Sequence, residues 1–560
     1  MISRLQTIVS TVTIFAAAFL PATALGQQSC ESVAGLMVPN TTITSAKVMP
    51  AGPFTAPPDM LGAIAPVNVP AFCRVTGVIK PTADSEIKFE LWMPTATWNG
   101  KFQQVGNGGF AGVIPSRGLL GPLVSGYAVA ATDDGHTGFT DVSWAVGHPE
   151  KLTDFAYRAV HSTADISKAI IRSFYGKQPG RSYFSGCSEG GREALIEAQR
   201  FPDDFDGIIV GAPANFWTHQ FAGFVWNEQA LLDDPESYIP PDKLPVIQAA
   251  ALAHCKQLEG AQDGILENPR RCDFDPEEIR CAAADGPNCL NAKQVAAVRK
   301  IYAGPSNPRT HEQIYPGYLP GNEVAHENWL PWITGAAPGK SIQAFFGNVF
   351  FGQMVFENPK WDFRGFSFDS DLRSADQKFG TILNAINPDL ERFRARGGKI
   401  IQYHGWADSA VAPVNSINYY EDVVSAQVIS AENDKGGKRG SADALKRTQS
   451  FYRLFMVPGM GHCSGGPGAD DFGNQSPVPP PQIDARHDLV SALDNWVDHG
   501  VAPDEIIATG YVDGNPAKGV VITHPLCPYP QEAKRIGRGS TKNSDDFVCR
   551  LPAHLVLIQH

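Results

Sequence analysis

The chain has 560 residues, 43% of them hydrophobic, so it is long enough for two domains or for one large domain with an insertion. Its formal net charge of −12, without a basic stripe, argues against a nucleic-acid partner. Beyond the amino terminus no stretch approaches the roughly 20 apolar residues of a membrane span, so none is predicted.

The amino terminus has the pattern of an export signal. Arg4 gives a positive start, residues 7–20 are apolar, and residues 22–26 are small enough for cleavage before Gln27. We therefore expect residues 1–26 to be a signal peptide and the mature protein to be secreted or periplasmic. In such an oxidising compartment the ten cysteines indicate five disulfides. Their spacing leaves the pairing open.

A strand-like run at 101–105 opens into a glycine-rich loop at 106–109. Glycine backbone can approach a bound molecule closely. We expect the N–H of Gly108 to help bind a developing oxyanion, with Gly109 as the alternative. A tight turn without any such role is the simpler interpretation.

The most informative stretch is residues 186–190 (Gly-Cys-Ser-Glu-Gly), a G-x-S-x-G pentapeptide. It follows the β-prone run 182–185 and precedes the strong helix formers of 192–200. Ser188 therefore stands at a strand-to-helix turn, which is the geometry of a nucleophile elbow. The pentapeptide alone also arises by chance, and its flanks favour the catalytic interpretation.

The elements around the elbow alternate between strand and helix. Strand-like runs lie at 87–93, 101–105, 126–132 and 205–214, and a long helix is expected near 156–175. This order predicts an α/β fold with a doubly wound, mostly parallel sheet. We assign it to residues 27–217 and 380–560. Between them, 218–379 is rich in proline, glycine and aromatic residues and is expected to be a lid domain.

Two later strands lead to an acid and a histidine. The run 398–405 ends just before Asp408, and the run 451–457 opens into a glycine-rich loop that carries His462. A capping aspartate and a surface histidine would explain each residue alone. In α/β-hydrolases, however, the triad follows the order serine, acid, histidine, and catalytic groups gather where strands end.

These residues predict nucleophilic catalysis. Ser188 is the nucleophile, His462 takes its proton, and Asp408 orients and stabilises the imidazole. The backbone N–H groups of Glu189 and Gly108 are expected to form the oxyanion hole.

Three motifs together resemble the tannase and feruloyl esterase family, which also contains the hydrolase of mono(2-hydroxyethyl) terephthalate. They are residues 186–194, 404–408 and 459–463. The resemblance implies an α/β-hydrolase fold with an inserted lid. It also implies five disulfides, which pair Cys30 with Cys73, Cys187 with Cys463, Cys255 with Cys272, Cys281 with Cys289, and Cys527 with Cys549.

Within the expected lid, residues 255–265 resemble the loop that binds a structural calcium ion in this family. Glu259 and Asp263 would offer carboxylates, and Ala261 and Ile265 would offer carbonyls. Lys256 stands where the family usually has an aspartate. A disulfide-closed turn with solvated acids is the alternative.

The lid is rich in aromatic residues suited to stacking on a phenolic ring. They include Trp329, Trp332, Phe345, Phe346, Phe350, Phe351 and Trp361. We expect most of them in the core of the lid and one or two on the substrate, with Trp361 the best candidate. His404 is also assigned to substrate binding.

The sequence thus predicts an exported serine esterase acting on small feruloyl-type aromatic esters, attached to plant polysaccharide or tannin. A tannin galloyl esterase and a terephthalate monoester hydrolase are the alternatives. A carbohydrate-binding protein on an inactive hydrolase fold is a more remote one, which the complete triad disfavours.

Overall fold

The structure is a computed structural model that describes residues 28–59, 62–140, 142–324, 328–435, 441–474 and 480–552. The side chains of 429–435 and 441 are outside this description, and so is the expected signal peptide at 1–26. Within the described parts, no helix is both long and apolar enough to cross a membrane.

The centre of the molecule is a mixed sheet in which five of the eight strand pairings are parallel. In spatial order, its nine described strands are β1 (Thr41–Met49), β4 (Phe72–Ile79), β5 (Ile87–Pro94), β7 (Ala128–Thr132), β6 (Lys101–Val105), β8 (Arg181–Cys187), β9 (Gly207–Gly211), β10 (Lys399–Gly405) and β11 (Tyr452–Val457). The parallel part, β7 to β11, carries the loops of interest.

Helices cover both faces of the sheet. Successive strand residues point to opposite sides, so a strand made of apolar residues presents an apolar surface on each face. In β9 and β10, Ile208 and Ile400 join one buried cluster, and their neighbours Ile209 and Ile401 join another. The first cluster includes α3 (Ala159–Tyr175), α4 (Glu189–Arg200) and α12 (Pro413–Lys435), and the second includes α14 (Leu489–His499). Next to it, α1 (Ser116–Val124) packs on β7. This confirms the expected doubly wound arrangement.

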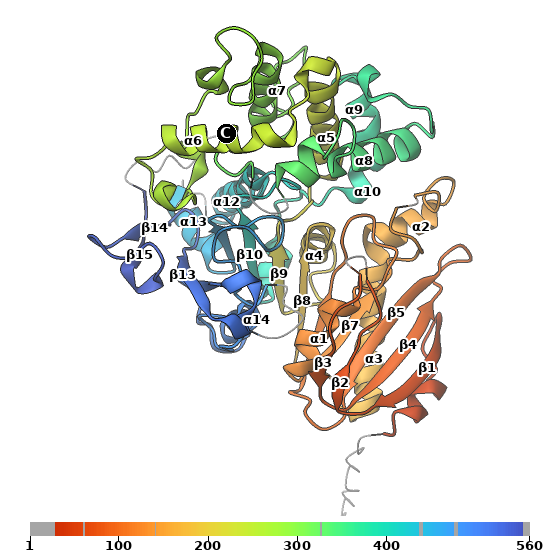
Figure 1. Cartoon of the computed structure of the whole chain (residues 1–560). Helices are drawn as coiled ribbons and strands as arrows, with labels where there is room; N and C mark the ends of the chain where they lie inside the picture. Colours follow the sequence, from red (N-terminus) through yellow and green to blue (C-terminus); the bar gives the residue numbers. More distant parts are fainter. Residues whose placement is uncertain are drawn as a thin grey trace, which may run out of the picture.

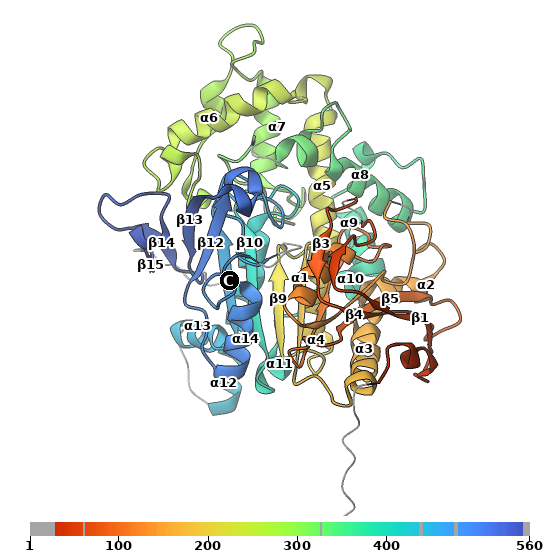
Figure 2. The ribbon, with the colours of Figure 1, turned by 60° about the horizontal axis from the view of Figure 1, so that its bottom comes forward.

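Between β9 and β10 the chain forms a helical layer above the sheet. Its α-helices are α5 (Trp217–Leu232), α6 (Leu244–His254), α7 (Ala292–Ala303), α8 (Ile342–Asn348), α9 (Ser370–Ala375) and α10 (Thr381–Leu383). In both views α5, α6, α7 and α8 lie together over the same side of the sheet (Figure 1, Figure 2). Their apolar side chains form one continuous cluster. The expected limits of 218 and 379 fall within helical elements, α5 and the turn Asp376–Gly380.

The remaining elements lie at the edges. The short helices are α2 (Pro149–Thr153), α11 (Glu391–Ala395) and α13 (Ser441–Gln449), and the small strand pairs are β2 (Gly52–Phe54) with β3 (Val67–Val69), β12 (Ile506–Tyr511) with β13 (Val520–Leu526), and β14 (Glu532–Arg535) with β15 (Phe547–Arg550). All five expected disulfides are present with the expected pairing, so that expectation is confirmed.

Candidate active site

Ser188 stands at a sharp turn between β8 and α4. Its backbone φ of 66° and ψ of −120° are unusual for a residue with a side chain and mark a strained position. A Cβ added to Gly186 would lie 2.4 Å from the carbonyl oxygen of Gly190. Glycine is therefore required there, which explains the pentapeptide and makes the turn a nucleophile elbow.

Asp408 follows β10 by three residues and is held by four donors. Its Oδ1 accepts from the N–H of Ala410 (2.7 Å) and of Val411 (2.9 Å), and its Oδ2 accepts from His462 Nδ1 (2.7 Å) and His404 Nε2 (3.2 Å). Burial favours a higher pKa, but the adjacent histidines outweigh it and lower the pKa of Asp408 below its ordinary value. The carboxylate is therefore ionised.

His462 lies in the loop after β11, and its Nδ1 faces Asp408. This contact leaves Nε2 as the ring nitrogen available for a serine hydroxyl. The Trp332 ring of the helical layer packs edge-on against the imidazole, with ring centres 5.3 Å apart. Ser188 and His462 line the same cavity. The disulfide between Cys187 and Cys463 joins the residue before Ser188 to the residue after His462, with Cα atoms 6.0 Å apart.

The expected oxyanion loop is hydrogen-bonded to the first two turns of α4. Asn107 donates its backbone N–H to Glu193 Oε2 (3.0 Å) and accepts from the N–H of Gly190 (2.9 Å). These bonds hold Gly108 beside the elbow, and both Gly108 and Glu189 line the cavity. Neither of their N–H groups donates to another described residue. Both remain suited to the predicted oxyanion contacts.

A buried acidic group lies behind this loop, which the sequence reasoning missed. Asp134, Glu189 and Glu193 converge there, and burial raises the pKa of all three well above the ordinary range. Arg192 pairs with Glu189 and is itself fully buried. The i, i+4 spacing of Glu189 and Glu193 places them on one helix face, but nothing local indicates that this face is covered.

The cavity that contains Ser188 and His462 has a volume of about 880 Å³. This is within the usual range for small-molecule sites, roughly 300–1,000 Å³. Its wall combines the sheet side with the helical layer. The aromatic side chains that line it are Tyr127, Phe139, Trp217, Phe221, Phe224, Trp332, Phe345 and Phe346.

Two expected substrate contacts differ from the structure. Trp361 packs against Phe351, Phe356 and Phe366 inside the helical layer and is not among the described residues that line the cavity. His404 is fully buried and bonds to Asp408, so no substrate can reach it. In both cases tertiary packing turns the ring away from the cavity.

The expected calcium loop offers few free donors. Glu259 Oε1 lies 3.4 Å from Arg535 Nε of β14, and Asp263 and Lys256 are exposed. The carbonyl of Ala261 already accepts from the N–H of Gly264 (3.2 Å). The cationic side chains at 256 and 535 disfavour a divalent ion at this loop. Calcium binding at Glu259, Ala261, Asp263 and Ile265 stays a prediction.

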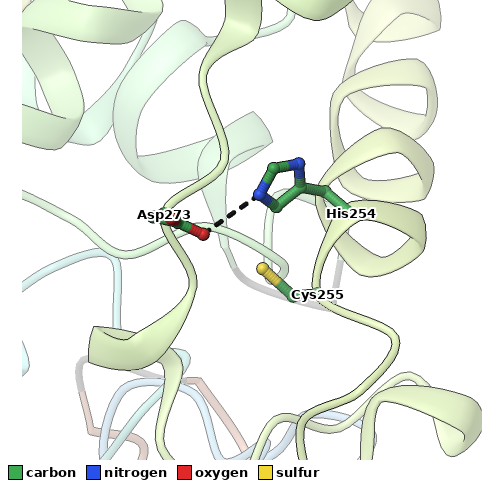
Figure 3. A group of neighbouring side chains, drawn as sticks. All are labelled: His254, Cys255 and Asp273. Carbon is green, nitrogen blue, oxygen red and sulfur yellow. Dashed lines mark hydrogen bonds and ion pairs between the residues drawn. The ribbon is translucent and has the colours of Figure 1, made fainter.

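A second group with metal-ligand chemistry lies at the end of α6 (Figure 3). Its sulfur belongs to Cys255, which is bonded to Cys272 and is therefore no ligand. His254 instead bonds Asp273 Oδ1 through Nε2 (3.0 Å) and Glu278 Oε1 through Nδ1 (2.9 Å). Hydrogen bonds to these two acids raise the pKa of His254. The group acts as a structural clamp.

Comparison with known proteins decides the family. A family model described as tannase and feruloyl esterase matches residues 73–550. The chain belongs to the tannase and feruloyl esterase family. One relative, an uncharacterized esterase of Xanthomonas campestris, is 44% identical to this chain over 549 residues. The match covers 96% of this chain and 94% of the relative. A probable feruloyl esterase B-2 of Aspergillus flavus is 34% identical, covering 82% and 83%.

Solved structures of the family agree with the fold. Feruloyl esterase B from Aspergillus oryzae superimposes with a TM-score of 0.81 at 26% identity, covering 93% of this chain and 99% of that protein. Tannin acyl hydrolase from Aspergillus niger gives 0.72 at 25% identity, covering 94% and 97%. The fold is therefore that of this α/β-hydrolase-like family, and ester hydrolysis is the activity that the relatives' names carry.

Proposed function

We propose that this esterase is an exported serine carboxylic ester hydrolase that cleaves aromatic esters of the feruloyl type through an acyl-enzyme. The observation that carries the proposal is the convergence of Ser188, on a strained elbow, with the Asp408–His462 pair in one cavity. Family membership and the names of the relatives support the same class of reaction.

The reaction begins when His462 Nε2 takes the proton of Ser188 and the serine oxygen attacks the ester carbonyl. Asp408, ionised and fixed by four donors, stabilises the resulting imidazolium. The N–H groups of Glu189 and Gly108 stabilise the oxyanion. His462 then returns the proton to the leaving alcohol, and the acyl group stays on Ser188. A water molecule, deprotonated by His462, releases the acid and restores the serine.

The aromatic wall supports an aromatic acyl group. Eight aromatic side chains line the cavity, and stacked or edge-on contacts between aromatic rings stabilise binding beyond simple burial. Trp332, Phe345 and Phe346 come from the helical layer between β9 and β10, so we assign this layer, approximately 218–379, the role of a lid that selects the acyl group. The ten paired cysteines support export.

A hydrolysis screen tests the proposal. Purified enzyme is assayed with methyl ferulate, methyl gallate and mono(2-hydroxyethyl) terephthalate, and the proposal predicts the highest kcat/KM for methyl ferulate. Preference for the gallate ester would favour the alternative of a tannin galloyl esterase. The structural similarity to tannin acyl hydrolase from Aspergillus niger supports that alternative. Preference for the terephthalate would favour the monoester hydrolase. Activity on none of them would reject the proposed function.

A further inference from the structure

The first turns of α5 form one wall of the cavity. Trp217, Gln220, Phe221 and Phe224 follow the i, i+3, i+4, i+7 spacing of a single helix face, and all four line the cavity. Three of them are aromatic, and Gln220 is the polar exception. An amide in an otherwise aromatic wall requires a hydrogen-bond partner.

Gln220 has no adequate partner within the described chain. The residue is only 4% exposed, and Oε1 has no hydrogen-bond partner among the described residues. Nε2 reaches the carbonyl of Ala410 only at 3.5 Å, the limit of a hydrogen bond. Gln343, a buried amide of the same layer, shows the contrast, because its Nε2 donates to Tyr318 Oη and to the carbonyl of Ser409, each at 2.7 Å.

The buried indole N–H of Trp217, three residues before Gln220, also lacks a hydrogen-bond partner among the described residues. Trp217 and Gln220 thus bring an N–H donor and an amide to the same face of α5. The carbonyl that Gln220 touches belongs to Ala410, whose own N–H donates to Asp408. Gln220 therefore lies in the part of the cavity next to the triad, and Trp217 lines the same cavity nearly one helical turn before it.

We propose that Gln220, together with Trp217, forms a subsite for a hydroxyl group on the acyl ring of the substrate. Rotation of the weakly held amide allows Oε1 to accept the hydroxyl proton, and the indole N–H donates to a ring oxygen. The inference rests on the proposed function and narrows its substrate class to ring-hydroxylated acyl groups. An unsubstituted ring leaves both buried groups unpaired, which is a strong source of discrimination. A ring carboxylate carries no proton to donate to Oε1.

The test compares two esters that differ only in the ring hydroxyl, methyl 4-hydroxycinnamate and methyl cinnamate. Wild-type enzyme is expected to prefer the hydroxylated ester by kcat/KM. Gln220→Leu should lower kcat/KM for that ester about tenfold or more and change that for methyl cinnamate less than about threefold. Gln229→Leu is the matched control, because Gln229 lies on α5, bonds the carbonyl of Phe363 and does not line the cavity. It should leave the ratio of the two substrates unchanged.

Equal losses on both esters, or an unchanged ratio in Gln220→Leu, would overturn the subsite. If Gln220→Leu does not fold, inhibition of the wild type decides the question. 4-Hydroxycinnamate should then inhibit more strongly than cinnamate, and equal inhibition by the two acids would overturn the subsite. A wild type that hydrolyses neither ester nor any substrate of the wider screen rejects the proposed function itself. A wild type that prefers methyl cinnamate rejects only this inference.

Discussion

Removing the disulfide between Cys187 and Cys463 should lower both stability and activity. The bond joins two loops that are 276 residues apart in sequence, one ending in Ser188 and the other beginning at His462. The disulfide between Cys281 and Cys289, in the helical layer between β9 and β10, spans only 8 residues, and neither cysteine lines the cavity that contains Ser188. It therefore offers a matched control within the same chain.

The expected sizes follow from the loops that the two bonds close. For 276 residues the loop-entropy relation gives about 5.6 kcal/mol as an upper limit. For 8 residues it gives about 2.5 kcal/mol. Measured losses are usually smaller than this relation, so we expect about 2–5 kcal/mol for Cys187→Ser/Cys463→Ser and less for Cys281→Ser/Cys289→Ser.

Guanidinium unfolding midpoints and kcat on methyl ferulate are measured for the two double variants and the wild type. The Cys187→Ser/Cys463→Ser variant should show the larger fall in midpoint and at least about a tenfold loss of kcat, because reacting groups lose their alignment. The control should keep its kcat. Equal midpoint losses, or full kcat in the first variant, would refute the view that this bond aligns the two loops.

Three further changes test the surroundings of the triad and the lid. Glu193→Gln keeps an acceptor for the N–H of Asn107, and burial raises the pKa of Glu193 and so favours the neutral acid that the amide resembles. The kcat of Glu193→Gln should therefore stay within about threefold, whereas Glu193→Leu should lose at least about tenfold. Equal kcat in the two variants would contradict the role of Glu193 in holding the loop at Asn107. His404→Leu removes a hydrogen-bond donor to Asp408 and should lower kcat about tenfold or more at nearly constant KM. A change in KM alone would contradict this and would support the earlier assignment of His404 to substrate binding. Burial raises the pKa of Glu228 to about 7. Between about pH 4 and pH 7 the folded protein therefore keeps a proton on Glu228 that the unfolded chain has lost. The free energy of unfolding consequently falls as pH rises through this range. Unfolding midpoints across this range should show Glu228→Gln gaining on the wild type as pH rises, and a constant difference would contradict this.

The sequence was sufficient for the features that depend on local chain geometry. The elbow at Ser188 needs glycines that the chain displays, and Asp408 and His462 each follow a recognisable buried strand. The alternation of strands and helices predicted the doubly wound sheet, because apolar residues recur with a different spacing in strands than in helices. The disulfide pairing, by contrast, came from family resemblance, since loop spacing alone allows many pairings.

The substrate contacts could not be predicted because they depend on how helices pack. Trp332 and Trp361 both lie in aromatic stretches, yet the Trp332 ring packs against His462 and the Trp361 ring packs inside the helical layer. The same holds for Gln220, whose importance appears only when its three aromatic neighbours on α5 are found lining the cavity. His404 shows the opposite error, a residue in a catalytic motif that holds the acid from behind.

The account's central claim is that Ser188 is a nucleophile activated by His462. A fluorophosphonate, which reacts with activated serines, tests it when the labelled enzyme is reduced, digested with trypsin and analysed by mass spectrometry. The account predicts one adduct per chain on Ser188, within the peptide 182–192, and a large loss of labelling in His462→Ala. Labelling on another serine, or hydrolysis of methyl ferulate that persists in Ser188→Ala, would contradict it.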